Sequence, residues 1–340
     1  MGNKLRVALG QFGALTDEMG KFAKQLGFDS IQLNTLGEDE SLWEYEGLLA
    51  LRQQCESYGL TLEAIENVPI QYFYKIMLGL EGRDEQIAKY QQIIRNMGKA
   101  GIPILGYHFM PDGTWRTSYT VPLRGGARGM GFDLDLVQTG APDRTGSLPI
   151  ARDPEYLKLL NSVADRVFTE EERWEYYEYF IRAVIPVAEE AGVKLALHPD
   201  DPPVPMVGGI ARLFHNIDGF KKAMEIADSD AWGLDLCLGT TSSMLGGADT
   251  VREMIEYFGS RNKIVYGHFR DVQGTVPKFN ECFLGEGNFS PVEMMRALKK
   301  VGFTGFIIDD HVPWIDYDEG WGYRSHAHQS GYLQGIIDAI

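Results

Sequence analysis

The chain has 340 residues, 44% of them hydrophobic, which is enough to bury a large core in one domain or two. Its 48 acidic and 32 basic residues give a net charge of -16, which argues against nucleic acid or an anionic membrane as partner. Three widely separated cysteines form no disulfide framework, and no apolar run is long enough to span a bilayer. We expect a cytoplasmic protein without a signal peptide, which forms a homo-oligomer.

Short apolar or β-branched runs alternate with amphipathic stretches along almost the whole chain. The runs predict strands at residues 5–10, 30–34, 61–67, 102–109, 194–198, 232–239, 263–269 and 305–311. A helix is predicted after each strand, at residues 16–27, 41–58, 85–100, 172–191, 218–229, 249–259, 290–301 and 328–340. This alternation predicts an α/β fold, a (β/α)8 TIM barrel that residues 1–340 form as a single domain. An open, doubly wound sheet is the competing architecture.

Two connections are longer than the others, and both follow the carboxyl end of a predicted strand. Residues 110–170 come after the fourth strand and contain a Gly- and Arg-rich stretch. Residues 312–327 come after the eighth strand. Connections of this length in a compact domain are usually functional. We therefore expect the first to be an insertion that acts as a lid, and the second to be an active-site loop.

Histidines gather where the predicted strands end. Pro199 lacks a backbone N–H, so the strand at 194–198 ends at His198. Because the carboxyl ends of barrel strands converge on one site, the polar residues at these ends are candidates for it. In chain order they are Asn67, His108, His198, Asp200, Asp201, Cys237, His268, Arg270, Asp310 and His311.

Four of these residues come from consecutive strands and could hold a divalent ion: His198, Cys237, His268 and Asp310. Each also has a structural explanation. Cys237 could be a small buried hydrophobe, His268 a hydrogen-bonded core residue, and Asp310 a cap for the following loop. A thiolate ligand disfavours Mg²⁺ and Ca²⁺, whereas the mixed donor set suits Mn²⁺, Fe²⁺, Co²⁺ or Zn²⁺.

The chain resembles the mannonate dehydratases, most specifically in "HPDDPP" (198–203) and the preceding "IPVAEEAG" (185–192). Similar but weaker segments are "GHFR" (267–270) and "DDHVP" (309–313). The resemblance implies a (β/α)8 barrel that uses a divalent ion, usually Mn²⁺, to remove water from D-mannonate and give 2-keto-3-deoxy-D-gluconate. By motif, the metal ligands fall on the same four residues. The catalytic residues fall on His311 and Tyr323.

The expected substrate shell is less complete than the metal shell. Ionised Tyr323 would take the C2 proton with Arg324 favouring its phenolate, and His311 would protonate the leaving C3 hydroxyl. Contacts to the sugar acid are expected from Asn67, His108, Asp200, Arg270, Arg324 and His326. The chain departs from the family pattern at Val204, at Pro313 and in "RSHAHQ" (324–329). A retained metal shell with an altered substrate shell suits a relative that acts on a different sugar acid or sugar.

Three functions follow from these features. The first is a metal-dependent lyase that dehydrates D-mannonate or a related sugar acid. The second is a metal-dependent sugar isomerase or epimerase of the xylose-isomerase-like barrels, for which the loop "GEGNFS" (285–290) also argues. The third is a sugar-binding barrel without catalysis, which has little use for four metal ligands. Product mass separates the first two, because only dehydration changes it.

Overall fold

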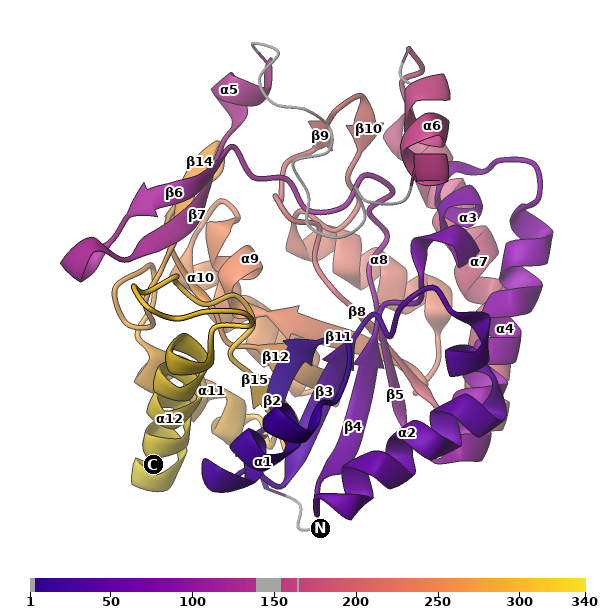
Figure 1. The fold of residues 1–340 in the computed structure, drawn as a ribbon. Helices are drawn as coiled ribbons and strands as arrows, with labels where there is room; N and C mark the ends of the chain where they lie inside the picture. Colours follow the sequence, from indigo (N-terminus) through magenta and orange to yellow (C-terminus); the bar gives the residue numbers. More distant parts are fainter. Residues whose placement is uncertain (1–3, 139–153, 164) are drawn as a thin grey trace.

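The predicted barrel is present in the computed structural model, which describes residues 4–138, 154–163 and 165–340. Its strands are all parallel and lie in the order β1-β15-β12-β11-β8-β5-β4-β3-β2 (Figure 1). They are β1 (Arg6–Val7), β2 (Leu9–Phe12), β3 (Ser30–Asn34), β4 (Thr61–Glu66), β5 (Ile104–Tyr107), β8 (Lys194–Leu197), β11 (Trp232–Cys237), β12 (Ile264–His268) and β15 (Phe306–Ile308). The barrel, and not the open sheet, is therefore the architecture.

The first predicted strand is divided at Ala8, and this division closes the barrel. β1 pairs with β15, the last strand, and β2 pairs with β3. One stretch of chain thus joins the two ends of the sheet, so that eight strand positions are formed by nine short strands. Every remaining strand neighbours the next barrel strand in sequence, as expected for successive βα units.

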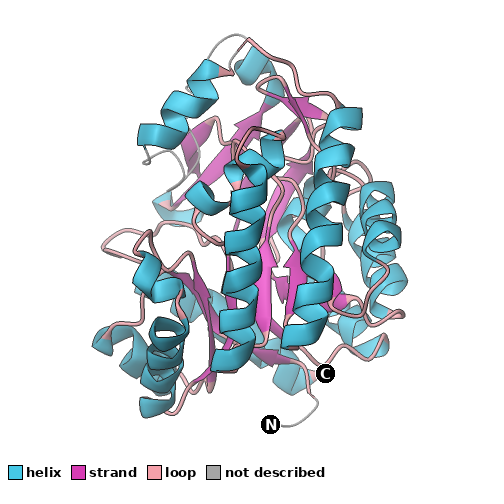
Figure 2. Cartoon of the chain, turned by 90° about the vertical axis from the view of Figure 1, so that its right-hand side faces the viewer, coloured by secondary structure: helices cyan, strands magenta, loops and turns pink. Residues whose placement is uncertain are grey.

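Helices cover the outside of the barrel, as Figure 2 shows for one side of it. The eight that follow the predicted order are α1 (Asp17–Gln25), α2 (Tyr45–Ser57), α4 (Arg83–Ala100), α7 (Glu170–Ala191), α8 (Ile217–Ala227), α10 (Ala248–Gly259), α11 (Pro291–Lys300) and α12 (Tyr323–Ala339). Short helices add α3 (Tyr74–Leu78), α9 (Leu238–Ser243), and the 3-10 turns η1 (Glu40–Trp43), η2 (Ile70–Tyr72) and η3 (Arg124–Gly126). Within the residues that the structure describes, no helix is long and apolar enough to cross a membrane.

Successive side chains of a barrel strand point to opposite faces of the sheet, so they pack in two separate hydrophobic clusters. In β4, Ile65 packs in the large core between strands and helices, whereas Ala64 belongs to a small cluster that includes Tyr266. Gly106 of β5 lies against the same cluster. A Cβ on it would be 2.2 Å from the Tyr266 hydroxyl and 2.8 Å from Cγ of Glu66, so only glycine leaves room there for both side chains.

The long connection after β5 contains secondary structure of its own. It contains β6 (Ser118–Pro122), β7 (Arg128–Asp133), α5 (Leu134–Gln138) and α6 (Pro154–Ser162), while residues 139–153 lie outside the described residues. β6 and β7 join the hairpin β13 (Asp271–Thr275) and β14 (Lys278–Cys282), which follows β12, in an antiparallel sheet of order β13-β14-β7-β6. A small pair, β9 (Met206–Val207) and β10 (Ile210–Ala211), follows β8. These elements lie above the carboxyl ends of the barrel strands (Figure 1).

The last helix begins earlier than predicted, at Tyr323, so the connection after β15 ends at Gly322. Gly322 has φ +94°, a left-handed conformation that suits glycine. The carboxylate of Asp318 accepts the backbone N–H groups of Arg324 and Ser325, which have no partner inside the helix. This cap stabilises the start of the helix at Tyr323, so the residues that follow are helical and not part of the loop.

Candidate active site

A cavity of about 690 Å³ opens at the carboxyl ends of the strands, and we call it the mouth cavity. This is the size of an ordinary small-molecule site. Its polar lining is formed largely by imidazoles and amides. The histidines are His108, His198, His268, His311 and His326. The amides are Gln11, Asn34, Asn67 and Gln71.

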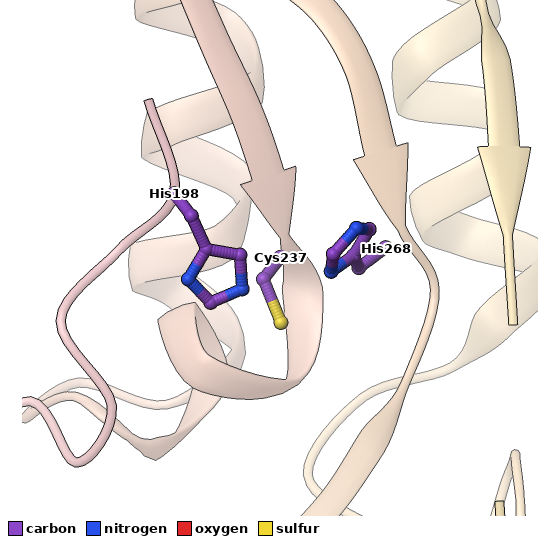
Figure 3. Close-up of side chains that lie close together, drawn as sticks. All are labelled: His198, Cys237 and His268. Atoms are coloured by element: carbon purple, nitrogen blue, oxygen red, sulfur yellow. The ribbon is translucent and has the colours of Figure 1, made fainter. Parts of the chain in front are cut away.

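The four predicted metal ligands lie together at one end of the mouth cavity. Ligand atoms of His198, Cys237 and His268 are all within 4.8 Å of one another. Figure 3 shows the sulfur of Cys237 between the two rings, and the three residues lie at or just after the ends of the neighbouring strands β8, β11 and β12. Asp310 completes the group, because its Oδ1 is 3.5 Å from Nδ1 of His268 and its Oδ2 is 3.8 Å from the Cys237 sulfur. The structure therefore brings these four side chains together.

Hydrogen bonds leave one nitrogen of each histidine free to coordinate a cation. Nδ1 of His198 lies 2.7 Å from the carbonyl oxygen of Pro199, which can only accept, so Nδ1 carries a proton and Nε2 is the nitrogen left for a cation. Nε2 of His268 lies 3.2 Å from both Glu66 and Asp235. Its Nδ1 is buried and has no hydrogen-bond partner among the described residues. Carboxylates that hold the far nitrogen of a histidine are the usual second layer of a metal site.

The charges around this group also favour a cation. Burial by itself raises the pKa of the Cys237 thiol, but the Arg270 charge and the two histidines outweigh it and hold that pKa well below its usual value. Cys237 is therefore available as a thiolate, the form that binds metals. Burial, aided by Glu66 and opposed by His268, raises the pKa of Asp235 to about 8. A divalent cation would relieve this crowding of acids, so the residues fit a metal ion.

Arg270 does not line the cavity but forms ion pairs with acidic residues around it. It is buried, and its guanidinium forms ion pairs with Asp201, Glu281 and Asp310. Arg116 of the insertion pairs with Asp201 and Glu281 at 2.7 Å. Arg270 is not among the residues that line the mouth cavity, so its expected contact with the substrate is not supported by this arrangement.

His311 lines the cavity and is held from behind by the accessory sheet. Its Nδ1 lies 3.0 Å from Oε1 of Glu281 on β14 and its Nε2 lies 3.8 Å from Oδ1 of Asp310. Burial lowers the pKa of His311, but the carboxylates of Asp310 and Glu281 outweigh burial and raise it above its usual value. These carboxylates favour the protonated form of His311, which can donate a proton, although Arg270 lies 3.0 Å from the same Nδ1 and opposes the shift.

Asn67 and His108 line the cavity as expected. The Asn67 amide donates to Oδ1 of Asn34 at 3.1 Å, which leaves its carbonyl oxygen for a ligand. Nδ1 of His108 accepts the backbone N–H of Met110 at 3.1 Å, so its proton is on Nε2. Burial, with His198 nearby, lowers the pKa of His108 to about 3. His108 is therefore a neutral hydrogen-bond donor.

Three other candidates are not in the cavity lining. Asp200 is buried and accepts the backbone N–H of Phe214 at 2.7 Å, so it ties together the segment after β8. The Tyr323 ring packs edge-on against Phe22 of α1, and burial together with Glu18 raises the pKa of its hydroxyl. A phenolate is thus disfavoured, and the placement gives no support for Tyr323 as the base. Arg324, in the first turn of α12, is exposed.

His326 is the residue of the last segment that does reach the cavity. It lies one turn into α12 and is buried, with Nδ1 3.1 Å from both oxygens of Asp309. Trp321, which also lines the cavity, stacks on its ring with centroids 3.7 Å apart. Because His326 lines the cavity, it can contact a ligand bound there, as expected.

Several residues of the site were missed from the sequence. Glu66 ends β4 one position before the predicted Asn67, and its place at a strand end was an available signal. Asp235 lies inside β11, where a charged residue within an apolar run was the only sign of it. Glu281 comes from a hairpin that the apolar pattern did not predict. These three carboxylates hold the predicted histidines in place.

Comparison with known proteins agrees with this geometry. The family model described as D-mannonate dehydratase (UxuA) matches residues 23–340. Mannonate dehydratase 2 of Halalkalibacterium halodurans is 32% identical over 311 residues, 88% of each chain, and the mannonate dehydratase of Thermotoga maritima is 33% identical over 322 residues, 88% of this chain and 87% of that one. The crystal structure of mannonate dehydratase from Streptococcus suis serotype 2 superposes with a TM-score of 0.84 at 27% identity, over 98% of this chain and 94% of that one.

More distant structures share the fold alone. One is a D-psicose 3-epimerase from Clostridium cellulolyticum, with a TM-score of 0.61 at 13% identity over 98% of this chain and 99% of that one. Both of these curated relatives are mannonate dehydratases, and the family match spans nearly the whole barrel. This confirms the resemblance found in the segments around His198 and Asp310. The chain belongs to the mannonate dehydratase family.

Proposed function

We propose that the protein is a metal-dependent hydro-lyase that removes water from D-mannonate or a related sugar acid and gives a 2-keto-3-deoxy sugar acid. The observation that carries this proposal is the group of His198, Cys237, His268 and Asp310 at the mouth cavity, in a chain of this family. Nδ1 of His268, which makes no hydrogen bond to the described residues and lies 3.5 Å from Oδ1 of Asp310, supports coordination of a cation.

We propose Mn²⁺ as the ion, with Fe²⁺, Co²⁺ and Zn²⁺ as the ions that the same ligands would accept. When bound, the ion supplies charge stabilisation to the substrate's C1 carboxylate and C2 oxygen as the C2 proton leaves. Glu66 and Asp235 hold Nε2 of His268 and so keep its Nδ1 turned toward the other ligands. These two carboxylates also offset the positive charge of the bound ion.

The remaining lining residues bind and orient the substrate. The Asn67 carbonyl and the Nε2–H of His108 offer an acceptor and a donor to sugar hydroxyls. His311 donates a proton to the hydroxyl that leaves C3, and Glu281 holds the ring in position for that transfer. None of the described lining residues is Lys or Arg, so a bound cation and His311 would carry the positive charge that an acidic substrate needs.

The test is product analysis after incubation of the Mn²⁺-loaded protein with a panel of aldonates and ketoses. We expect one aldonate to lose the mass of water and to give a 2-keto-3-deoxy acid, which forms a chromophore with semicarbazide. Chelator-treated protein and the His198→Ala variant should give no product. A product of unchanged mass would contradict dehydration and would favour the isomerase or epimerase alternative.

A further inference from the structure

Asp309 and His326 form a buried pair beside the mouth cavity that the proposed reaction has not yet used. Asp309 directly follows β15 and is fully buried. His326 and Ser330 are four residues apart on one face of α12, and both reach Asp309, the Ser330 hydroxyl at 2.8 Å. Because a carboxylate only accepts hydrogen bonds, Nδ1 of His326 carries a proton, and Nε2 is the ring nitrogen left to act on a substrate.

The other four histidines of the cavity lack a free acceptor nitrogen for a substrate proton. His108 carries its proton on Nε2 because Nδ1 accepts a backbone N–H. His198 and His268 are assigned to the metal ion. His311 lies between the carboxylates of Glu281 and Asp310 and has the role of proton donor in the proposed reaction. Tyr323 lies outside the lining altogether. Among the histidines of the described lining, His326 is thus the one whose Nε2 has no other role in the site.

Trp321 restricts the ring of His326 to one orientation. The two rings are stacked with an interplanar angle of 2°, and the indole N–H donates to the carbonyl oxygen of Gln11 at 3.1 Å. The imidazole is therefore fixed by stacking on one face and by Asp309 at Nδ1. A base fixed in this way needs little reorganisation when it takes a proton.

We propose that His326 is the catalytic base that removes the C2 proton and that Asp309 is its positioning residue. This inference rests on the proposed dehydration. Nε2 of His326 takes the proton as the C2–H bond breaks, and that electron pair forms the C2–C3 double bond while the C3–O bond breaks. The leaving hydroxide takes a proton from His311 and departs as water. The enol then tautomerises to the 2-keto acid, and Asp309 balances the imidazolium charge meanwhile.

The test compares His326→Gln with His328→Gln, its matched control on the same helix. His328 is exposed, packs against Phe283 and Tyr332, and is outside the cavity lining. For His326→Gln we expect kcat to fall roughly 10²-fold or more with unchanged Mn²⁺ content. With C2-deuterated substrate it should show a larger primary isotope effect than the parent, since proton removal becomes limiting. His328→Gln should keep the parental rate.

Asp309→Asn provides a second variant if His326→Gln does not fold. An amide can donate to Nδ1 and so favour the wrong tautomer, and we expect kcat to fall by roughly 10²-fold with little change in KM. Parental turnover in either folded variant, or a loss of rate with an unchanged isotope effect, would overturn the assignment. Failure of the proposed function is a separate result, because the parent enzyme would then give no 2-keto-3-deoxy product from any aldonate.

Discussion

Replacing Asp235 with Asn should weaken metal binding although Asp235 is not one of the four proposed ligands. Its carboxylate is fully buried and lies 3.2 Å from Nε2 of His268. A carboxylate there fixes the ring and makes the opposite nitrogen a better donor to a cation. Asn keeps the shape of the side chain but removes its charge, so the change isolates this electrostatic support.

The geometry bounds the size of the effect. Two unit charges 3.2 Å apart interact by about 5 kcal/mol at an effective dielectric constant of about 20, which is the upper limit. Two features reduce it. Burial raises the pKa of Asp235 to about 8, so it is only partly ionised near neutrality, and Glu66 remains at the same distance from the same nitrogen. We therefore expect a loss of roughly 10- to 100-fold in Mn²⁺ affinity, about 1.4–2.7 kcal/mol.

The assay measures the affinity for Mn²⁺ by calorimetric titration of chelator-treated protein at about pH 7. Asp200→Asn is the matched control, because Asp200 is equally buried at the same end of the barrel but does not line the cavity. Its amide oxygen can still accept the N–H of Phe214. Parental affinity in Asp235→Asn, or an equal loss in Asp200→Asn, would refute the role given to Asp235.

Three further changes test the rest of the site. Cys237→Ala should lose Mn²⁺ in metal analysis while circular dichroism stays unchanged, and full occupancy would argue against the site. Glu281→Gln should move the alkaline limb of the pH profile of kcat/KM to lower pH. Glu281 helps to raise the pKa of His311, so without its charge the protonated form of His311 is lost at lower pH. An unchanged profile would contradict His311 as the acid. Tyr323→Phe should keep kcat within about twofold of the parent, since the ring packs on Phe22, and a large loss would restore Tyr323 as the base.

Much of the site could be predicted because a barrel strand delivers its last residue to a shared mouth. His198, Cys237, His268 and Asp310 each lie at or just after the end of a strand, so counting strands was sufficient to group them. Counting strands does not predict where Tyr323 lies, and the structure places it outside the cavity lining. It follows the last strand in sequence, but it begins α12 just after the capping Asp318, and its ring packs against Phe22 of α1.

The sequence by itself determined the barrel and the group of proposed metal ligands, because strand alternation and residue type at strand ends are local properties. Tertiary structure alone decided which nitrogen of each histidine is free, since that depends on partners far away in the chain. Asp235 is 33 residues from His268 in sequence but pairs with it across neighbouring strands, and Glu281 reaches His311 from a separate sheet. Only three-dimensional packing sets Asp309 against His326, because the end of a strand and the first turns of α12 meet there.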